Sequence, residues 1–239
     1  MRLINGIILF GTGLILSACS NTLSSNIKTS GFYVTYSVNA TGGAIASCEA
    51  SFNVGGSTGT YVDLDGGDTV TCNGLSMSRY QDPIFHTITY KVNVPAVVGG
   101  VYEIKFVRVG ENPYSATVTL PAPILATAPA ANANIVKGST LTASWVASTD
   151  PYTSMAVNLS YSVPKDSGST TYSYSKYDSA PENGTVGWGI SETQVYPAQA
   201  GPWTGTVKFT RSKSGEMAAG LSGYISAEQT VSVSVSLVD

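Results

Sequence analysis

Apolar and polar residues alternate with a period of two along most of this chain, and the alternation constrains its fold more than any other feature. Successive side chains of a strand point to opposite faces, so such a pattern puts one face against a core and the other in water. The alternation starts at Phe32 and closes with the run from Val231 to Leu237. Beyond the first 18 residues, no stretch of ten or more shows the 3.6-residue period of a helix. The sequence therefore predicts an all-β protein.

The first group of predicted strands occupies residues 31–122. Alternating segments run from Phe32 to Leu120, with Gly, Asn, Asp or Pro between them. Seven strands in about 90 residues are typical of an immunoglobulin-like β-sandwich. In the segment from Val101 to Val109, a change of phase near Phe106 predicts a β-bulge.

The second group occupies residues 123–239, after a boundary marked by Pro121 and Pro123. The run from Pro129 through Val136 to Trp145 resembles the opening strands of immunoglobulin-like and fibronectin type III-like domains, in which an early Trp fills the core. That resemblance implies a second sandwich with Trp145 inside. This half contains no cysteine, so no immunoglobulin-type disulfide is expected in it.

The first residues predict an export signal. Arg2 precedes an apolar run from Ile7 to Leu16, which is too short to span a membrane as a helix. The following residues, Leu16 to Cys19, resemble the lipobox of bacterial lipoproteins. The resemblance implies a signal peptide over residues 1–18 and diacylglyceryl and acyl chains on Cys19, enough for stable membrane anchoring. The alternative is an ordinary signal peptide in which Cys19 is incidental.

The residues after Cys19 bear on where the anchor goes and how far it reaches. Ser20 stands where an Asp tends to retain lipoproteins of Gram-negative bacteria at the inner membrane, so the resemblance implies the outer membrane, periplasmic or surface-facing. From Asn21 to Ser30 the chain is polar and without a hydrophobic period. Residues 19–30 are therefore predicted to form a flexible, lipidated tether.

With Cys19 assigned to lipid, Cys48 and Cys72 remain as a pair in an oxidising compartment. Each lies on the apolar parity of its strand, so both side chains are predicted to point inward, where they can meet. The sequence therefore predicts a Cys48–Cys72 disulfide, with two buried free thiols as the alternative.

Charged groups are sparse and give little chemistry. The net charge is −3 with 12 Lys and Arg, which makes nucleic acid an unexpected partner. Asp63, Asp65 and Asp68 suggest either a calcium loop or, since the full calcium-loop spacing is missing, a hairpin turn at Asp65–Gly66. His86 is the single histidine, predicted at a strand end on the rim of the core. No cofactor is expected.

Aromatic residues of the second half are the remaining candidates for binding. Exposed rings stack on sugar faces, so Tyr172, Tyr174 and Trp203 are candidate glycan contacts. The alternative is that such rings fill the core or cover a sandwich edge.

The whole chain resembles bacterial lipoproteins with tandem domains of the immunoglobulin and fibronectin type III kind. The leading hypothesis is a non-enzymatic envelope or surface lipoprotein, held in the membrane through Cys19, that acts through protein partners or as a spacer. A glycan-binding second domain is the alternative, and a hydrolase a remote one.

Overall fold

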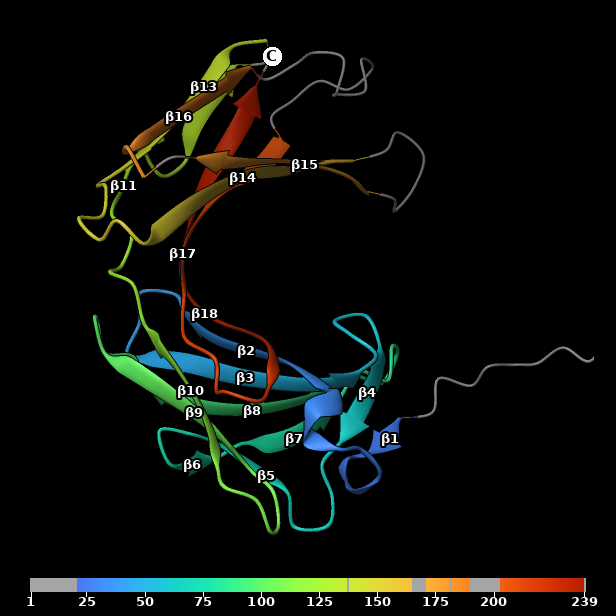
Figure 1. Cartoon of the computed structure of the whole chain (residues 1–239). Helices are drawn as coiled ribbons and strands as arrows, with labels where there is room; N and C mark the ends of the chain where they lie inside the picture. Colours follow the sequence, from blue (N-terminus) through green and yellow to red (C-terminus); the bar gives the residue numbers. More distant parts are fainter. Residues whose placement is uncertain (1–20, 137, 165–170, 181, 190–202, 239) are drawn as a thin grey trace, which may run out of the picture.

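A computed structural model describes residues 21–136, 138–164, 171–180, 182–189 and 203–238 (Figure 1). The described residues form strands β1 to β18 and two short 3₁₀ turns, η1 (Ser24–Asn26) and η2 (Thr29–Gly31), with no α-helix among them. The predicted all-β fold is confirmed. None of these helical turns is long and apolar enough to cross a membrane.

Two sheets pack around the first core, in the lower part of Figure 1. One runs in the order β7-β8-β3-β2-β18 and the other in the order β10-β9-β5-β6. The strands of the first are β2 (Phe32–Ala40), β3 (Ile45–Val54), β7 (Ser78–Gln81), β8 (Ile88–Pro95) and β18 (Ser222–Val238). Those of the second are β5 (Thr69–Cys72), β6 (Leu75–Ser76), β9 (Val101–Val107) and β10 (Tyr114–Thr119). Strands β4 (Thr60–Asp63) and β1 (Thr22–Leu23) continue past the end of β3.

The first core forms where the alternation predicts it. Every second residue of β2 is buried, from Phe32 to Ala40, and Phe52 packs against Phe106 of the opposite sheet with ring centroids 4.8 Å apart. Cys48 of β3 and Cys72 of β5 are fully buried and form a disulfide between the two sheets. The predicted disulfide is confirmed, because both cysteines lie on the inward parity of their strands.

Two sheets also surround the second core, and one of them continues the sheet of β2 and β3 through β18, so that these strands form a single 11-stranded sheet. One contains β12, β18, β17, β14 and β15, and the other has the order β11-β13-β16. Their bounds are β11 (Ala126–Ala128), β12 (Ala133–Val136), β13 (Thr140–Trp145), β14 (Thr153–Pro164), β15 (Thr171–Ala180), β16 (Thr185–Gly189) and β17 (Trp203–Ser214). Trp145 is 4% exposed within this core, as predicted.

The last strand belongs to both cores. Residues Ser222–Gln229 of β18 pair in parallel with β2, whereas Ser226–Leu237 pair with β17. Leu221, Ile225 and Ala227 therefore lie in the first core, and further along the strand Val235 and Leu237 lie in the second. We call each core with the strands around it a unit, the first and the second. The sequence alone predicted that all of residues 123–239 belong to the second unit, with this strand beginning near Val231.

Glycine permits this close pairing at one position. Gly223 has φ of 135°, and a Cβ there would lie 1.8 Å from the carbonyl oxygen of Val34. A side chain at residue 223 would therefore push β18 away from β2.

Two local predictions are wrong. Strand β9 has no phase change: Tyr102, Ile104 and Phe106 are buried in strict alternation, and Arg108 continues their parity. Residues 22–30 of the predicted tether (19–30) are not free, because β1 pairs with β4 and Ile27 packs against the first core.

Candidate functional site

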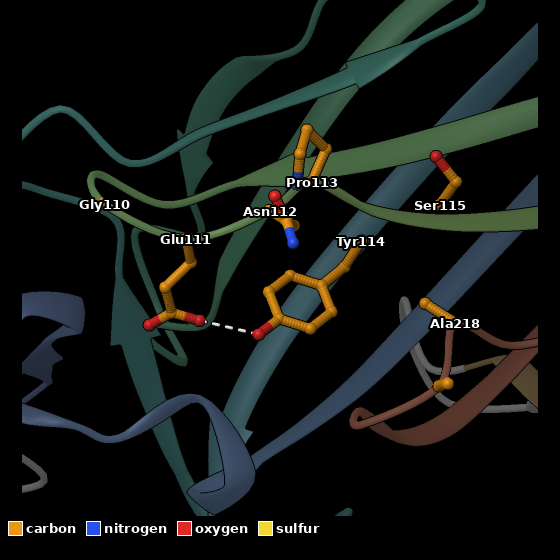
Figure 2. A pocket seen from close by; sticks show the side chains of 8 residues that line it. Gly110, Glu111, Asn112, Pro113, Tyr114, Ser115 and Ala218 are labelled. Atoms are coloured by element: carbon orange, nitrogen blue, oxygen red, sulfur yellow. Dashed lines mark hydrogen bonds between the residues drawn. The ribbon is translucent and has the colours of Figure 1, made fainter.

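A hollow of about 610 Å³ lies beside the turn between β9 and β10 (Figure 2). Residues 110–115 form one wall, and Ala218 and Ala219 from the β17–β18 connection form the other. The Tyr114 hydroxyl donates a 2.6 Å hydrogen bond to Glu111. This bond lowers the pKa of Glu111 and raises the pKa of Tyr114. Both groups are thereby held in their ordinary protonation states, which is unsuited to proton transfer near neutral pH.

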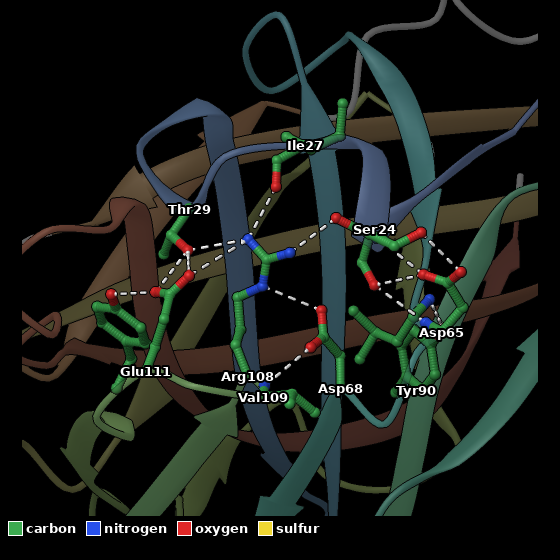
Figure 3. A network of polar contacts seen from close by, with 12 residues as sticks. Ser24, Ile27, Thr29, Asp65, Asp68, Tyr90, Arg108, Val109 and Glu111 are labelled. Carbon is green, nitrogen blue, oxygen red and sulfur yellow. Dashed lines mark hydrogen bonds and ion pairs between the residues drawn. The ribbon is translucent and has the colours of Figure 1, made fainter.

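Glu111 joins this hollow to a second feature, a polar network around Arg108 (Figure 3). Arg108 is only 9% exposed. Its Nε donates to Asp68 over 3.0 Å, and Nη1 donates to the carbonyl oxygen of Ile27 and to Thr29 Oγ1. Its Nη2 donates to the carbonyl oxygen of Ser24 over 2.8 Å. One guanidinium thus holds the segment from Ser24 to Thr29 against the first core.

Asp65 holds the start of the same segment. Its carboxylate accepts hydrogen bonds from the Ser25 backbone N–H, the Ser25 hydroxyl and the Ser24 hydroxyl, all between 2.8 and 2.9 Å. These bonds, led by that from the Ser25 N–H, lower the pKa of Asp65. We call residues Ser24–Thr29 with Asp65, Asp68 and Arg108 the N-terminal clamp. It is the physical reason why the predicted tether is docked, since the polar groups of this segment bond to charged side chains, of which Arg108 is buried.

The three candidate calcium ligands serve separate partners. Asp63 accepts from Arg79 Nε and the Tyr90 hydroxyl, Asp65 binds the two serines, and Asp68 binds Arg108. No three His, Cys, Asp or Glu side chains within the described ranges are placed to hold a metal ion. Asp65–Gly66 does form a turn, with the Asp68 N–H bonded to the Asp65 carbonyl. The turn joins strands of two different sheets, so the predicted hairpin is wrong.

A second buried arginine lies where the two cores meet. Arg211 of β17 is 2% exposed and forms a 2.6 Å ion pair with Glu182. It also donates to the carbonyl oxygens of Ala122, Pro123 and Val146. Glu182 in turn accepts from the Trp145 indole and the Ser148 N–H. We call Arg211, Glu182 and these partners the junction network, because it fixes the connection between the first and second cores.

Of the candidate glycan contacts, one is buried and the side chains of the other two are not described. Trp203 is 3% exposed and packs in the second core, so its ring is not available to a sugar and that prediction is wrong. Tyr172 and Tyr174 lie in β15, in register with Val163 and Tyr161, and their side chains lie outside the described residues. Tyr152 is 78% exposed, with Lys213 Nζ 5.9 Å from its ring centroid.

His86 and Cys19 complete the predicted sites. His86 is exposed in the β7–β8 turn with φ of 55° rather than at the rim of the core, because the turn ends before β8 begins at Ile88. Cys19 and the predicted signal peptide over residues 1–18 lie outside the described residues.

Arg108 and Arg211 were not predicted from the sequence, although the sequence contains a signal for both. Arg108 shares parity with Ile104 and Phe106, and Arg211 shares parity with Val207 and Phe209. A charge on the apolar parity of a strand indicates a buried, paired group. Such pairing holds chain segments in place.

No protein-family model matches the chain, and a search of curated proteins finds no significant match. Its function is therefore inferred from its own residues.

Proposed function

We propose that the chain is a bacterial lipoprotein, anchored through lipid on Cys19 in the outer membrane, that acts as a rigid spacer presenting its second unit to a protein partner. The lipobox-like residues Leu16 to Cys19 support the anchor, and Ser20 supports the outer-membrane address. Each core would belong to an immunoglobulin-like sandwich, arranged in tandem. The protein has no catalytic role in this proposal.

The observation that carries the spacer function is the shared strand β18. Its 17 residues span about 55 Å if fully extended. Because Ile225 lies in the first core and Leu237 in the second, the two units are joined by hydrogen-bonded strand as well as by the connection at residues 120–126. The junction network adds a buried ion pair at the same place. Bending between the units would break these bonds.

The N-terminal clamp supports the same proposal from the other end. A flexible tether would let the protein tumble above the membrane, whereas the clamp leaves only Cys19 to Asn21 between the lipid and the first core. Two residue steps reach about 7 Å. The anchor would therefore set the height and orientation of the whole molecule, as a spacer requires.

Intact mass tests the anchor. Protein extracted from membranes should lack residues 1–18, carry two or three acyl chains and gain two hydrogens on reduction of the disulfide. The Cys19→Ala variant should lack the acyl chains. An unacylated wild-type protein would contradict the proposal.

Distance measurement between spin labels tests the rigidity. Asn112→Cys in the β9–β10 turn and Thr142→Cys in β13 are exposed positions on the first and second units. Electron paramagnetic resonance on the doubly labelled protein should give one narrow distance distribution. The same pair with Gln229→Pro, which interrupts β18 between the cores, should give a broad one. A broad distribution in the parent would refute the spacer.

A further inference from the structure

The turn between β7 and β8 exposes two adjacent large apolar side chains. Ile84 is 75% exposed and Phe85 76%, and residues 82–87 contain no Lys or Arg. Neighbouring exposed apolar side chains of this size indicate a contact surface for a partner or a membrane.

The turn is held in one conformation by its own hydrogen bonds. Asp82 accepts from the backbone N–H groups of Ile84 and Phe85, at 2.8 and 2.7 Å. The His86 N–H donates to the Asp82 carbonyl, and the Asp82 N–H donates to the Thr87 carbonyl. Ile84 and Phe85 are thus presented outward by a fixed loop, which lowers the conformational entropy lost on contact.

Strand directions place this turn beside the point where the chain enters the described structure. β3 ends at Val54, and β4, antiparallel to it, begins there with Thr60 opposite Val54. β1 is parallel to β4, so Asn21 precedes it at the same end. β8 is also antiparallel to β3, with Tyr90 opposite Ala50. The turn before β8 therefore projects from this end too, the end of the first unit at which β1 is labelled in Figure 1.

We propose that the turn 82–87 inserts Ile84 and Phe85 into the interfacial region of the leaflet that holds the lipid on Cys19. The inference rests on the proposed anchor. Cys19 lies within about 7 Å of Asn21 by chain length alone, so this end of the first unit must face the bilayer. Apolar side chains at such a position bury themselves at the boundary between headgroups and acyl chains.

Other exposed groups favour a membrane as the occupant. Leu23 of β1 is 45% exposed and Val109, two residues beyond β9, is 72% exposed. Arg108 beside Val109 is bonded to Ser24, so both apolar side chains lie at the end that carries the N-terminal clamp. Exposed apolar side chains at this end of the first unit suit a lipid surface.

Tryptophan fluorescence in vesicles tests the inference on the full protein. Phe85→Trp places a reporter on the turn. Val98→Trp is the matched control, because Val98 is 59% exposed in the β8–β9 turn, at the opposite end of the first unit, where Pro95 pairs with Ile45. Each is compared with the parent in vesicles of phosphatidylethanolamine and phosphatidylglycerol with brominated acyl chains, which quench only rings within the bilayer.

Emission added by Phe85→Trp should be quenched at least about twice as strongly as that added by Val98→Trp, since interfacial side chains sit about 5–10 Å deep. Adding Ile84→Asp to Phe85→Trp should bring the quenching down toward the control. Equal quenching at both positions in acylated protein would overturn the inference, leave the anchor standing, and point to a protein as occupant. The intact mass of the same sample shows whether Cys19 is acylated. Unacylated protein would refute the proposed function. If that protein also shows no preferential quenching of Phe85→Trp, the insertion is refuted as well.

Discussion

Arg108 and Ser24 are 84 positions apart in the chain, yet Nη2 of the arginine donates to the serine carbonyl oxygen over 2.8 Å. The contact makes the first described residues part of the first unit. Whatever is attached before residue 21 is therefore connected to a folded body.

Replacing Arg108 should free the N-terminal segment. Arg108→Ala leaves the carboxylate of Asp68, whose side chain is 6% exposed, without its partner. We expect a loss of about 3–5 kcal/mol in the free energy of unfolding, and new proteolytic cleavage within residues 22–31. Lys105→Ala on the same strand is the control, because its exposed pair with Glu103 should contribute under about 1 kcal/mol. Equal protease resistance in both variants would contradict the clamp.

The junction network should depend on Arg211 in the same way. Arg211→Met leaves Glu182 buried without a charge partner. It also removes the hydrogen-bond donor of three backbone carbonyl oxygens. Denaturant unfolding should show a loss of about 3–5 kcal/mol. Lys208→Met, exposed on the same strand, should change stability by less than about 0.5 kcal/mol. The hypothesis fails if Arg211→Met unfolds at the midpoint of the parent.

Two buried tyrosines should respond oppositely to loss of their hydroxyls. Tyr36 is fully buried, and its hydroxyl has no hydrogen-bond partner among the described residues. Burial also raises the pKa of this tyrosine. Tyr36→Phe should therefore raise the free energy of unfolding by about 1 kcal/mol. The Tyr90 hydroxyl bonds Asp63 and the Leu64 N–H, so Tyr90→Phe should lower it by about 1–2 kcal/mol. Thermal unfolding distinguishes the signs.

Removing the disulfide should weaken the first unit. Cys48 and Cys72 close a loop of 24 residues, for which chain entropy predicts a loss of about 3.5 kcal/mol in the double Ala variant. Chemical unfolding of the parent with and without reductant gives the matching comparison. A midpoint unmoved by reduction would mean that the thiols are free in solution.

The clamp should loosen in acid. The folded pKa of Asp65 lies below its usual value because Ser24 and Ser25 donate to the carboxylate. Its contribution to stability is therefore present above the ordinary Asp pKa of about 3.9 and is lost as the pH falls through the lower folded value. Nuclear magnetic resonance of the Ser25 amide should titrate with a midpoint below about 3.9. Asp65→Asn should abolish that titration, and a midpoint above 4 in the parent would be evidence against these bonds.

Local patterns predicted the strands but not the contacts that connect distant segments. The burial of Phe32, Cys48 and Trp145 was predictable, because alternation decides which side chains of a strand face inward whatever the order of the strands. The pairing of Ile225 with Tyr36 in β18 and β2 joins the two ends of the chain, and no local rule selects that partner.

The candidate networks were missed for a related reason. Arg108 is polar but continues the inward parity of β9, so the local pattern of the sequence suggests a phase change that the strand does not have. The residues from Ser24 to Thr29 have no apolar period, and their order comes from charged side chains in the β4–β5 turn and directly after β9. Such order depends on tertiary partners, whereas composition alone indicates a linker.

The shared strand also constrains the order in which the molecule can form. Tandem domains generally fold one after another as the chain is synthesised. Here Leu221, Ile225 and Ala227 complete a core whose other buried members, among the described residues, all precede Pro121. The first unit therefore cannot complete its fold, and β2 lacks its β18 neighbour, until almost the whole second unit has been synthesised.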